Sequence, residues 1–191
     1  MTTILDLPDE IHLLVGKQLS PKVVYSCIRV CRAFYSAYIP CLWSNIHVRT
    51  YKGNIISVNQ LRANAHRVET IDYSSTLTDD YYTIVYPRLQ AIRTSTYFGD
   101  KKDPNFMRVQ RHQKAQFARL HPTIRKLYYG QPDGLSKEFW EVVETEWKEL
   151  ETLDMSSVVE EDAVDAFWRV CDRVHNLSLT GVELPKDFPI L

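Results

Sequence analysis

The cysteine and histidine residues have the most obvious capacity for chemistry in this sequence. Cys27 and Cys31 are four residues apart, and on a helix this spacing would place two thiolates one turn apart, where both could ligate a metal ion. No second pair of Cys or His residues completes a tetrahedral set, and the sequence has no HExxH, GxSxG or glycine-rich phosphate loop. We therefore expect no metal, no cofactor and no catalytic centre, and we predict that the protein is not an enzyme.

The first part of the sequence has the apolar spacing of three short helices. The expected helical faces are Ile11, Leu14 and Val15, then Val23, Val24, Cys27, Ile28 and Cys31, and finally Phe34, Tyr35, Tyr38 and Ile39. Ser20-Pro21 is a start signal for the second helix, and Pro40 is expected to end the third. A module of about 40 residues is near the lower size limit for a stable core, so we expect it to depend on a partner.

A different apolar spacing recurs along the rest of the sequence. It consists of an apolar residue, two variable positions, a second apolar residue, one variable position and a third apolar residue. It occurs as VETIDY from Val68, LQAIRT from Leu89, IRKLYY from Ile124, LETLDM from Leu150 and VHNLSL from Val174, with Thr94 in the last position of the second copy. Amphipathic helical segments separate these expected strands. A strand and a helix that repeat roughly every 20–29 residues are typical of leucine-rich repeats, so we expect a short, irregular α/β solenoid with a parallel sheet.

The N-terminal module resembles an F-box. The resemblance rests on LDLPDEI at residues 5–11, on Leu19-Ser20-Pro21, on VCRAFY at residues 30–35 and on PCLW at residues 40–43. The segment FWRVCDRVHNLSLTGVELP resembles the divergent repeats of fungal-type F-box proteins with leucine-rich repeats. The predicted organisation is an F-box at residues 1–48, a connecting helix at residues 49–67 and a divergent leucine-rich-repeat array at residues 68–191.

This resemblance implies a function in recognition. In such proteins the F-box docks on a Skp-type adaptor of a cullin-RING ubiquitin ligase, and the repeats capture a protein substrate. Carried over to this sequence, the adaptor contact falls on Leu7, Pro8, Ile11, Leu14, Leu19, Val24, Val30, Cys31, Leu42 and Trp43. We expect a location in the cytoplasm, the nucleus or both, because the sequence has no signal peptide and no apolar run long enough to cross a membrane.

Charge is distributed unevenly, although the formal net charge is only -1. Residues 88–126 carry 10 Lys/Arg and 2 Asp/Glu, whereas residues 127–191 carry 5 Lys/Arg and 15 Asp/Glu. A basic segment of this kind can bind nucleic acid through phosphate contacts, which is an alternative function, or it can recruit an acidic substrate. We expect it mainly to complement the acidic last third of the chain, so nucleic acid is not the expected partner.

The end of the sequence suggests a further alternative. Few residues follow the last expected strand, and they leave little sequence for the polar cap that a repeat array usually needs. A truncated F-box protein of this kind would bind the adaptor and sequester it, without delivering a substrate.

Overall fold

The structure of the chain is a computed structural model that describes residues 4–48, 56–73, 79–94, 104–131 and 134–183. The chain divides into two compact units, residues 1–46 and residues 47–191, and each is described by itself. Among the described residues, no helix is both long enough and apolar enough to cross a membrane.

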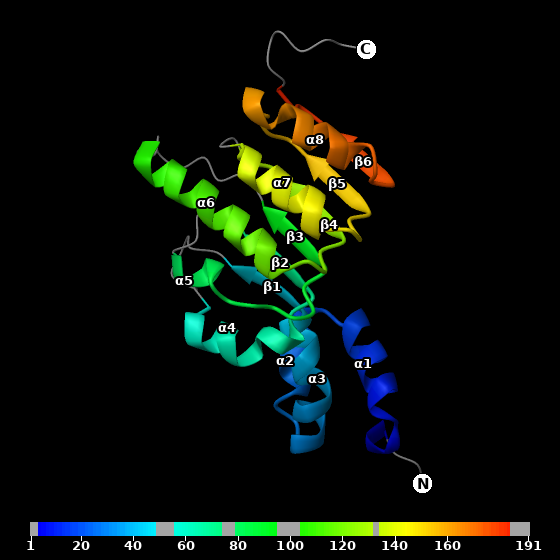
Figure 1. Cartoon of the computed structure of the whole chain (residues 1–191). Coiled ribbons are helices and arrows are strands. Elements are labelled where there is room, and N and C mark those ends of the chain that lie inside the picture. The colour runs from blue at the N-terminus through cyan, green and yellow to red at the C-terminus, as the bar shows by residue number, and fades with distance from the viewer. Residues whose placement is uncertain (1–3, 49–55, 74–78, 95–103, 132–133, 184–191) are drawn as a thin grey trace. The chain divides into compact units, whose positions relative to one another are not determined.

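The first unit is a bundle of three helices. They are α1 (Asp9–Gln18), α2 (Pro21–Cys27) and α3 (Arg32–Ser44), preceded by the short 3₁₀ helix η1 (Ile4–Asp6) (Figure 1). Ser20 stands at the N-cap of α2 and Pro21 at its first position, in agreement with the start signal in the sequence. Both α1 and α2 pack against α3.

Two features of this bundle differ from the sequence expectation. Pro40 lies inside α3 and does not end it; the loss of one backbone hydrogen bond is offset by the packing of this helix against α1 and α2. The second helix ends at Cys27, and Cys31 is the extended N-cap of α3, so the two thiols do not share a helix. In the part of the chain that the structure describes, no group of three or more His, Cys, Asp or Glu residues could hold a metal ion.

The second unit is built on a six-stranded sheet whose strands follow the order of the chain; the first strand begins at Asn45 and crosses the boundary between the two units. The strands are β1 (Asn45–Val48), β2 (Thr70–Tyr73), β3 (Ala91–Thr94), β4 (Lys126–Tyr129), β5 (Thr152–Met155) and β6 (Asn176–Leu179). Successive strands from β2 to β6 pair in parallel. The predicted fold class, a three-helix module followed by a parallel α/β repeat, is therefore confirmed.

The sheet pairs equivalent positions of the repeated apolar motif. The residues that stand third in each motif pair across the sheet in one row, Thr70–Ala91–Lys126–Thr152–Asn176. The second apolar position is buried from β2 to β5, at Ile71, Ile92, Leu127 and Leu153. In β6, the last strand of the sheet, the equivalent Leu177 is 44% exposed, because an edge strand has a neighbour on one side only.

Strand β1 was not predicted from the sequence. It nevertheless follows the repeated spacing, with Trp43, Ile46 and Val48 at the three apolar positions. Ile46 and Val48 are buried, with 4% and 0% of their surface exposed. This sixth copy of the motif overlaps the PCLW signature of the N-terminal module, because Trp43 belongs to both.

Helices alternate with the strands of the second unit. They are α4 (Val58–Asn64), α5 (Asp79–Tyr82), α6 (Pro104–Leu120), α7 (Lys137–Glu146) and α8 (Val164–Cys171), with the 3₁₀ helices η2 (Ala65–Arg67) and η3 (Glu161–Ala163). Of the connecting segment expected at residues 49–67, residues 49–55 lie outside the described residues.

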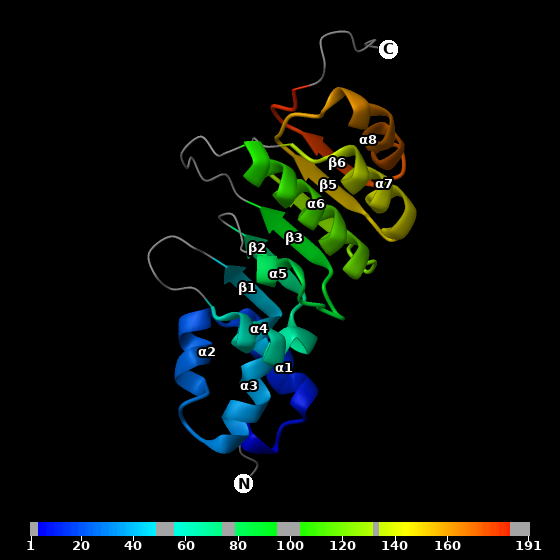
Figure 2. The same cartoon turned by 60° about the vertical axis from the view of Figure 1, so that its left-hand side comes forward.

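The helices α6, α7 and α8 stand side by side along one face of the sheet (Figure 1 and Figure 2). A sheet whose parallel strands follow chain order places successive right-handed crossovers on the same face. The core therefore lies between this face and the helices.

Aromatic side chains fill much of this core. Trp140 of α7 and Phe167 of α8 are both 0% exposed, and their ring centroids are 4.9 Å apart. The indole Nε1 of Trp147 donates a hydrogen bond to the carbonyl of Ala118 in α6 at 2.9 Å. Ser136 caps α7 by accepting a hydrogen bond from the backbone N–H of Phe139.

Candidate partner-binding surface

The contact between α1 and α3 depends on a glycine. A Cβ atom at Gly16 would overlap the Sγ of Cys41 and would lie only 2.8 Å from Cδ1 of Tyr38. The same Sγ donates to the carbonyl of Leu13 at 3.8 Å. Glycine costs a helix about 1 kcal/mol relative to alanine, and the close approach of these two helices is the reason for its presence here.

His12 lies one turn before Gly16 on the same side of α1. It is 4% exposed, and its Nδ1 is 3.3 Å from the hydroxyl of Tyr38. Its ring also packs edge-on against the rings of Phe34 and Tyr38. This histidine is therefore part of the core of the bundle, a role that the sequence analysis did not assign to it.

The apolar stripe formed by α1 and by the residues just before it faces away from α3. Because His12 and Gly16 occupy the inner side, the side chains of Leu7, Ile11 and Leu14 remain 38%, 41% and 61% exposed. The spacing of these three residues places them on one face of the helix. Val15, Val23, Tyr25, Val30 and Tyr35 are further large apolar residues of this unit that are exposed. So many exposed apolar side chains on a unit of this size indicate a surface that binds another protein.

A comparison with known protein families agrees with this interpretation. Residues 4–49 match the family described as F-box-like. The first unit is an F-box-like domain. The comparison with curated proteins finds no match for the chain. The description of the second unit as leucine-rich repeats thus stays an inference from its strand and helix order.

The F-box-like domain exposes part of the predicted adaptor contact. The exposed members are Leu7, Pro8, Ile11, Leu14 and Val30. The half-buried members are Leu19, Cys31, Leu42 and Trp43. Val24 is 2% exposed, so it supports the bundle from within and offers almost no surface to a partner. Val23 and Tyr25 beside it, which are not among the predicted contact residues, are exposed instead.

Outside this domain, cations of the basic segment pair with carboxylates of the acidic last third. The ion pairs include Arg111–Glu160 at 2.5 Å, Arg119–Glu138 at 3.0 Å and Arg125–Glu149 at 2.7 Å. Nδ1 of His112 is also within hydrogen-bond distance of Oε2 of Glu138, at 3.1 Å. Desolvation raises the pKa of Glu138, but its hydrogen bonds with His112 and Arg119 outweigh this and hold the pKa below its ordinary value. These pairs favour the expected internal complement over a nucleic-acid interface.

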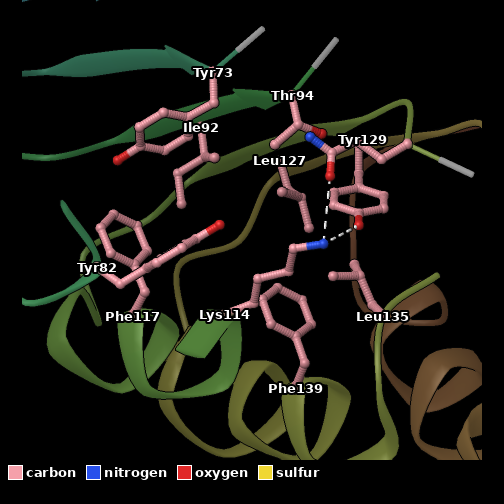
Figure 3. Close-up of a pocket in the computed structure, with 11 residues that line it drawn as sticks. Tyr73, Tyr82, Ile92, Thr94, Lys114, Phe117, Leu127, Tyr129, Leu135 and Phe139 are labelled. Carbon is pink, nitrogen blue, oxygen red and sulfur yellow. Dashed lines mark hydrogen bonds between the residues drawn. The ribbon is translucent and has the colours of Figure 1, made fainter. Parts of the chain in front are cut away.

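A small pocket lies between the sheet and the helices α6 and α7 (Figure 3). Lys114 extends into it from α6 and is 8% exposed. Its ammonium donates to the hydroxyl of Tyr129 at 2.8 Å and to Oε1 of Gln131 at 3.3 Å. The hydroxyl of Tyr129 in turn donates to the carbonyl of Gly134 at 3.2 Å. The cavity of about 40 Å³ has room for a few water molecules, and the hydrogen bonds of Lys114 tie α6 to β4.

Two further buried groups have strongly shifted pKa values for structural reasons. The Nε2 of His121 accepts from the backbone N–H of Tyr86 at 3.0 Å, and its Nδ1 donates to the carbonyl of Phe117 at 2.7 Å. Burial lowers the pKa of His121 to about 4, so the ring is neutral at pH 7. Burial likewise raises the pKa of the Cys171 thiol to about 12, which makes it a poor nucleophile.

Proposed function

We propose that the chain is a substrate-recognition subunit of a Skp–cullin–F-box ubiquitin ligase. In this proposal the F-box-like domain docks on a Skp-type adaptor, and the second unit holds a protein substrate. The chain performs no chemistry itself; it raises the effective concentration of the substrate at the site of ubiquitin transfer. Such a ligase acts in the cytoplasm or the nucleus, which is therefore the proposed location.

The observation that carries this proposal is the exposed stripe of Leu7, Ile11 and Leu14 in a domain that matches the F-box-like family. A well-buried apolar side chain contributes about 1.5–3 kcal/mol. A few such side chains supply a micromolar association, which requires about 8 kcal/mol after the costs of binding. The stripe is therefore large enough to support a specific complex.

Co-purification of the full chain with a Skp-type adaptor tests the proposal. The substitution Leu14→Asp changes the most exposed residue of the stripe, at 61% exposed, and should abolish adaptor binding while the chain stays folded. Leu120→Asp is the matched control, because Leu120 is 40% exposed at the end of α6. This control should bind the adaptor as the wild type does.

Circular dichroism of each variant shows whether the helices are retained. The proposal is wrong if the wild-type chain does not bind the adaptor, or if folded Leu14→Asp binds it equally well.

A further inference from the structure

The face of the sheet opposite the helices carries mostly polar side chains. In the strand register they form two rows, Thr70–Ala91–Lys126–Thr152–Asn176 and Asp72–Arg93–Tyr128–Asp154–Ser178. All these residues except Ala91 are exposed or half-buried. We call these ten positions the open face. Parallel sheets are normally covered on both sides. The open face, by contrast, is largely exposed or half-buried, so it is available to a partner.

Two cations lie diagonally across neighbouring strands of the open face. Arg93 of β3 pairs in register with Tyr128, and Lys126 of β4 pairs with Ala91. The guanidinium carbon of Arg93 is 4.6 Å from the ring centroid of Tyr128. A stacked guanidinium keeps its N–H edge available for a carboxylate. The small side chain of Ala91, which is only 8% exposed, leaves space above the sheet next to the two cations.

These two charges differ from four described arginines of the basic segment. Arg88, Arg111, Arg119 and Arg125 each form an ion pair with a glutamate. Arg93 and Lys126, by contrast, form no ion pair with any other described residue. Their charge is therefore not neutralised within the described structure.

Acidic residues flank this pair of cations. Asp72 lies beside Arg93 on β2, and its Oδ2 is 3.0 Å from Nδ1 of His47. Asp154 lies on β5, two strands beyond Arg93. Because neighbouring strands are about 4.8 Å apart, Asp154 is about 10 Å from Arg93 across the sheet. An extended chain covers this distance in about three residues. Because Lys and Arg have long side chains, a basic residue two to four positions from the acidic one can reach Asp154.

We propose that the open face binds an extended segment of a protein substrate with an acidic residue and a nearby basic residue. The carboxylate of that Glu or Asp lies between Arg93 and Lys126, and the basic residue, two to four positions away, pairs with Asp154. A carboxylate fits better than a phosphate because Asp72 and Asp154 repel a second negative charge at this location. The inference rests on the proposed function, since it names the class of substrate that the second unit would hold.

Selection from a displayed library of random peptides tests the inference without knowledge of the substrate. The full-length wild-type chain should enrich peptides that have an acidic residue with a Lys or Arg two to four positions away. The same selection with Arg93→Gln should lose this pattern. Arg169→Gln is the matched control, because Arg169 pairs with Glu144 on the helical side, and it should keep the pattern.

Fluorescence anisotropy with the most enriched peptide then measures the contribution of the carboxylate. Replacement of the acidic residue of the peptide by its amide, or use of Arg93→Gln, should weaken binding by about tenfold or more, since charge-assisted hydrogen bonds contribute about 1.5–3 kcal/mol. Equal binding of the amide peptide would overturn the inference, as would the absence of any enriched pattern. Tighter binding of a phosphoserine peptide would overturn the choice of a carboxylate.

Adaptor binding separates this inference from the proposed function. Arg93→Gln should co-purify with the Skp-type adaptor as well as the wild type does, because Arg93 lies outside the F-box-like domain. Loss of peptide selectivity with intact adaptor binding supports the inference. Failure of the wild type to bind the adaptor contradicts the proposed function whatever the peptides show.

Discussion

Gly16 of α1 lies against Tyr38 of α3 so closely that any side chain at position 16 would enter the ring and the thiol of Cys41. We predict that Gly16→Ala destabilises the F-box-like domain by about 1–2 kcal/mol. The added methyl group costs about 1–3 kcal/mol through overpacking, and the better helix propensity of alanine returns up to about 1 kcal/mol. Hydrogen exchange of the backbone amides of α1 and α3 measures the change in this domain alone.

Gln18→Ala is the control for this substitution. Gln18 is exposed at the end of the same helix, so its replacement should change amide protection by less than about 0.5 kcal/mol. If the amide protection of Gly16→Ala equals that of the wild type, the two helices can move apart to accommodate the methyl group without loss of stability, and the prediction is wrong.

His121 makes the second unit sensitive to acid. Its pKa is about 4 in the folded chain, against 6.5 for the ordinary value. As the pH falls below about 6.5, His121 binds a proton in the unfolded chain but stays neutral in the folded chain. The free energy of unfolding therefore decreases until about pH 4. The total loss is about 3 kcal/mol, since one pKa unit corresponds to about 1.4 kcal/mol. Urea unfolding followed by tryptophan fluorescence from pH 7 to pH 4 measures this slope.

His121→Asn should reduce the slope between pH 6.5 and pH 4.5, at the cost of lower stability at pH 7. His175→Asn, the same substitution at an exposed position, should leave the slope unchanged. Acidic residues such as Glu138, whose pKa is depressed below 4.5, stabilise the fold at higher pH and lose this contribution only as the pH falls to about 4.5 and below. An identical slope in wild type and His121→Asn would contradict the prediction.

The buried hydrogen bond between Lys114 and Tyr129 should be detectable as a coupling energy. Tyr129→Phe removes one acceptor from a buried ammonium and should destabilise the second unit by about 1–3 kcal/mol. Lys114→Met in the Tyr129→Phe background should recover part of this loss, because the buried charge that lost the hydroxyl of Tyr129 is then removed as well. Chemical denaturation of the two single variants and the double variant gives the cycle.

Tyr128→Phe serves as the control for Tyr129→Phe. Tyr128 is the adjacent residue, but it is half-buried on the open face, so the loss of its hydroxyl should have an effect below about 0.5 kcal/mol. Additive energies for Lys114→Met and Tyr129→Phe would mean that the two side chains do not interact in solution.

The sequence by itself determined the parts of the fold that depend on local spacing. The repeated apolar motif located β2 to β6, because alternate residues of a strand face the core and the copies share the same apolar positions, apart from Thr94 on β3. The signatures around Pro8, Ser20-Pro21 and PCLW identified the F-box-like module. The segregation of charge along the chain indicated the ion pairs that now join Arg111 and Arg119 to later glutamates.

Only the tertiary structure decided which side chains are buried, which are exposed and which charges form ion pairs. Spacing alone gives α1 an apolar stripe, but the close contact at Gly16 turns that stripe outward and buries His12 instead. The F-box resemblance includes Val24 in the adaptor contact, but only the fold shows that its side chain is 2% exposed. Spacing alone also left β1 unpredicted, because Trp43 belongs to two overlapping patterns. The charges of Arg93 and Arg119 are equivalent in the sequence. The fold places Arg93 on the open face of the sheet, whereas the packing of α6 beside α7 brings Arg119 to Glu138, because partners distant in the chain meet only when it folds.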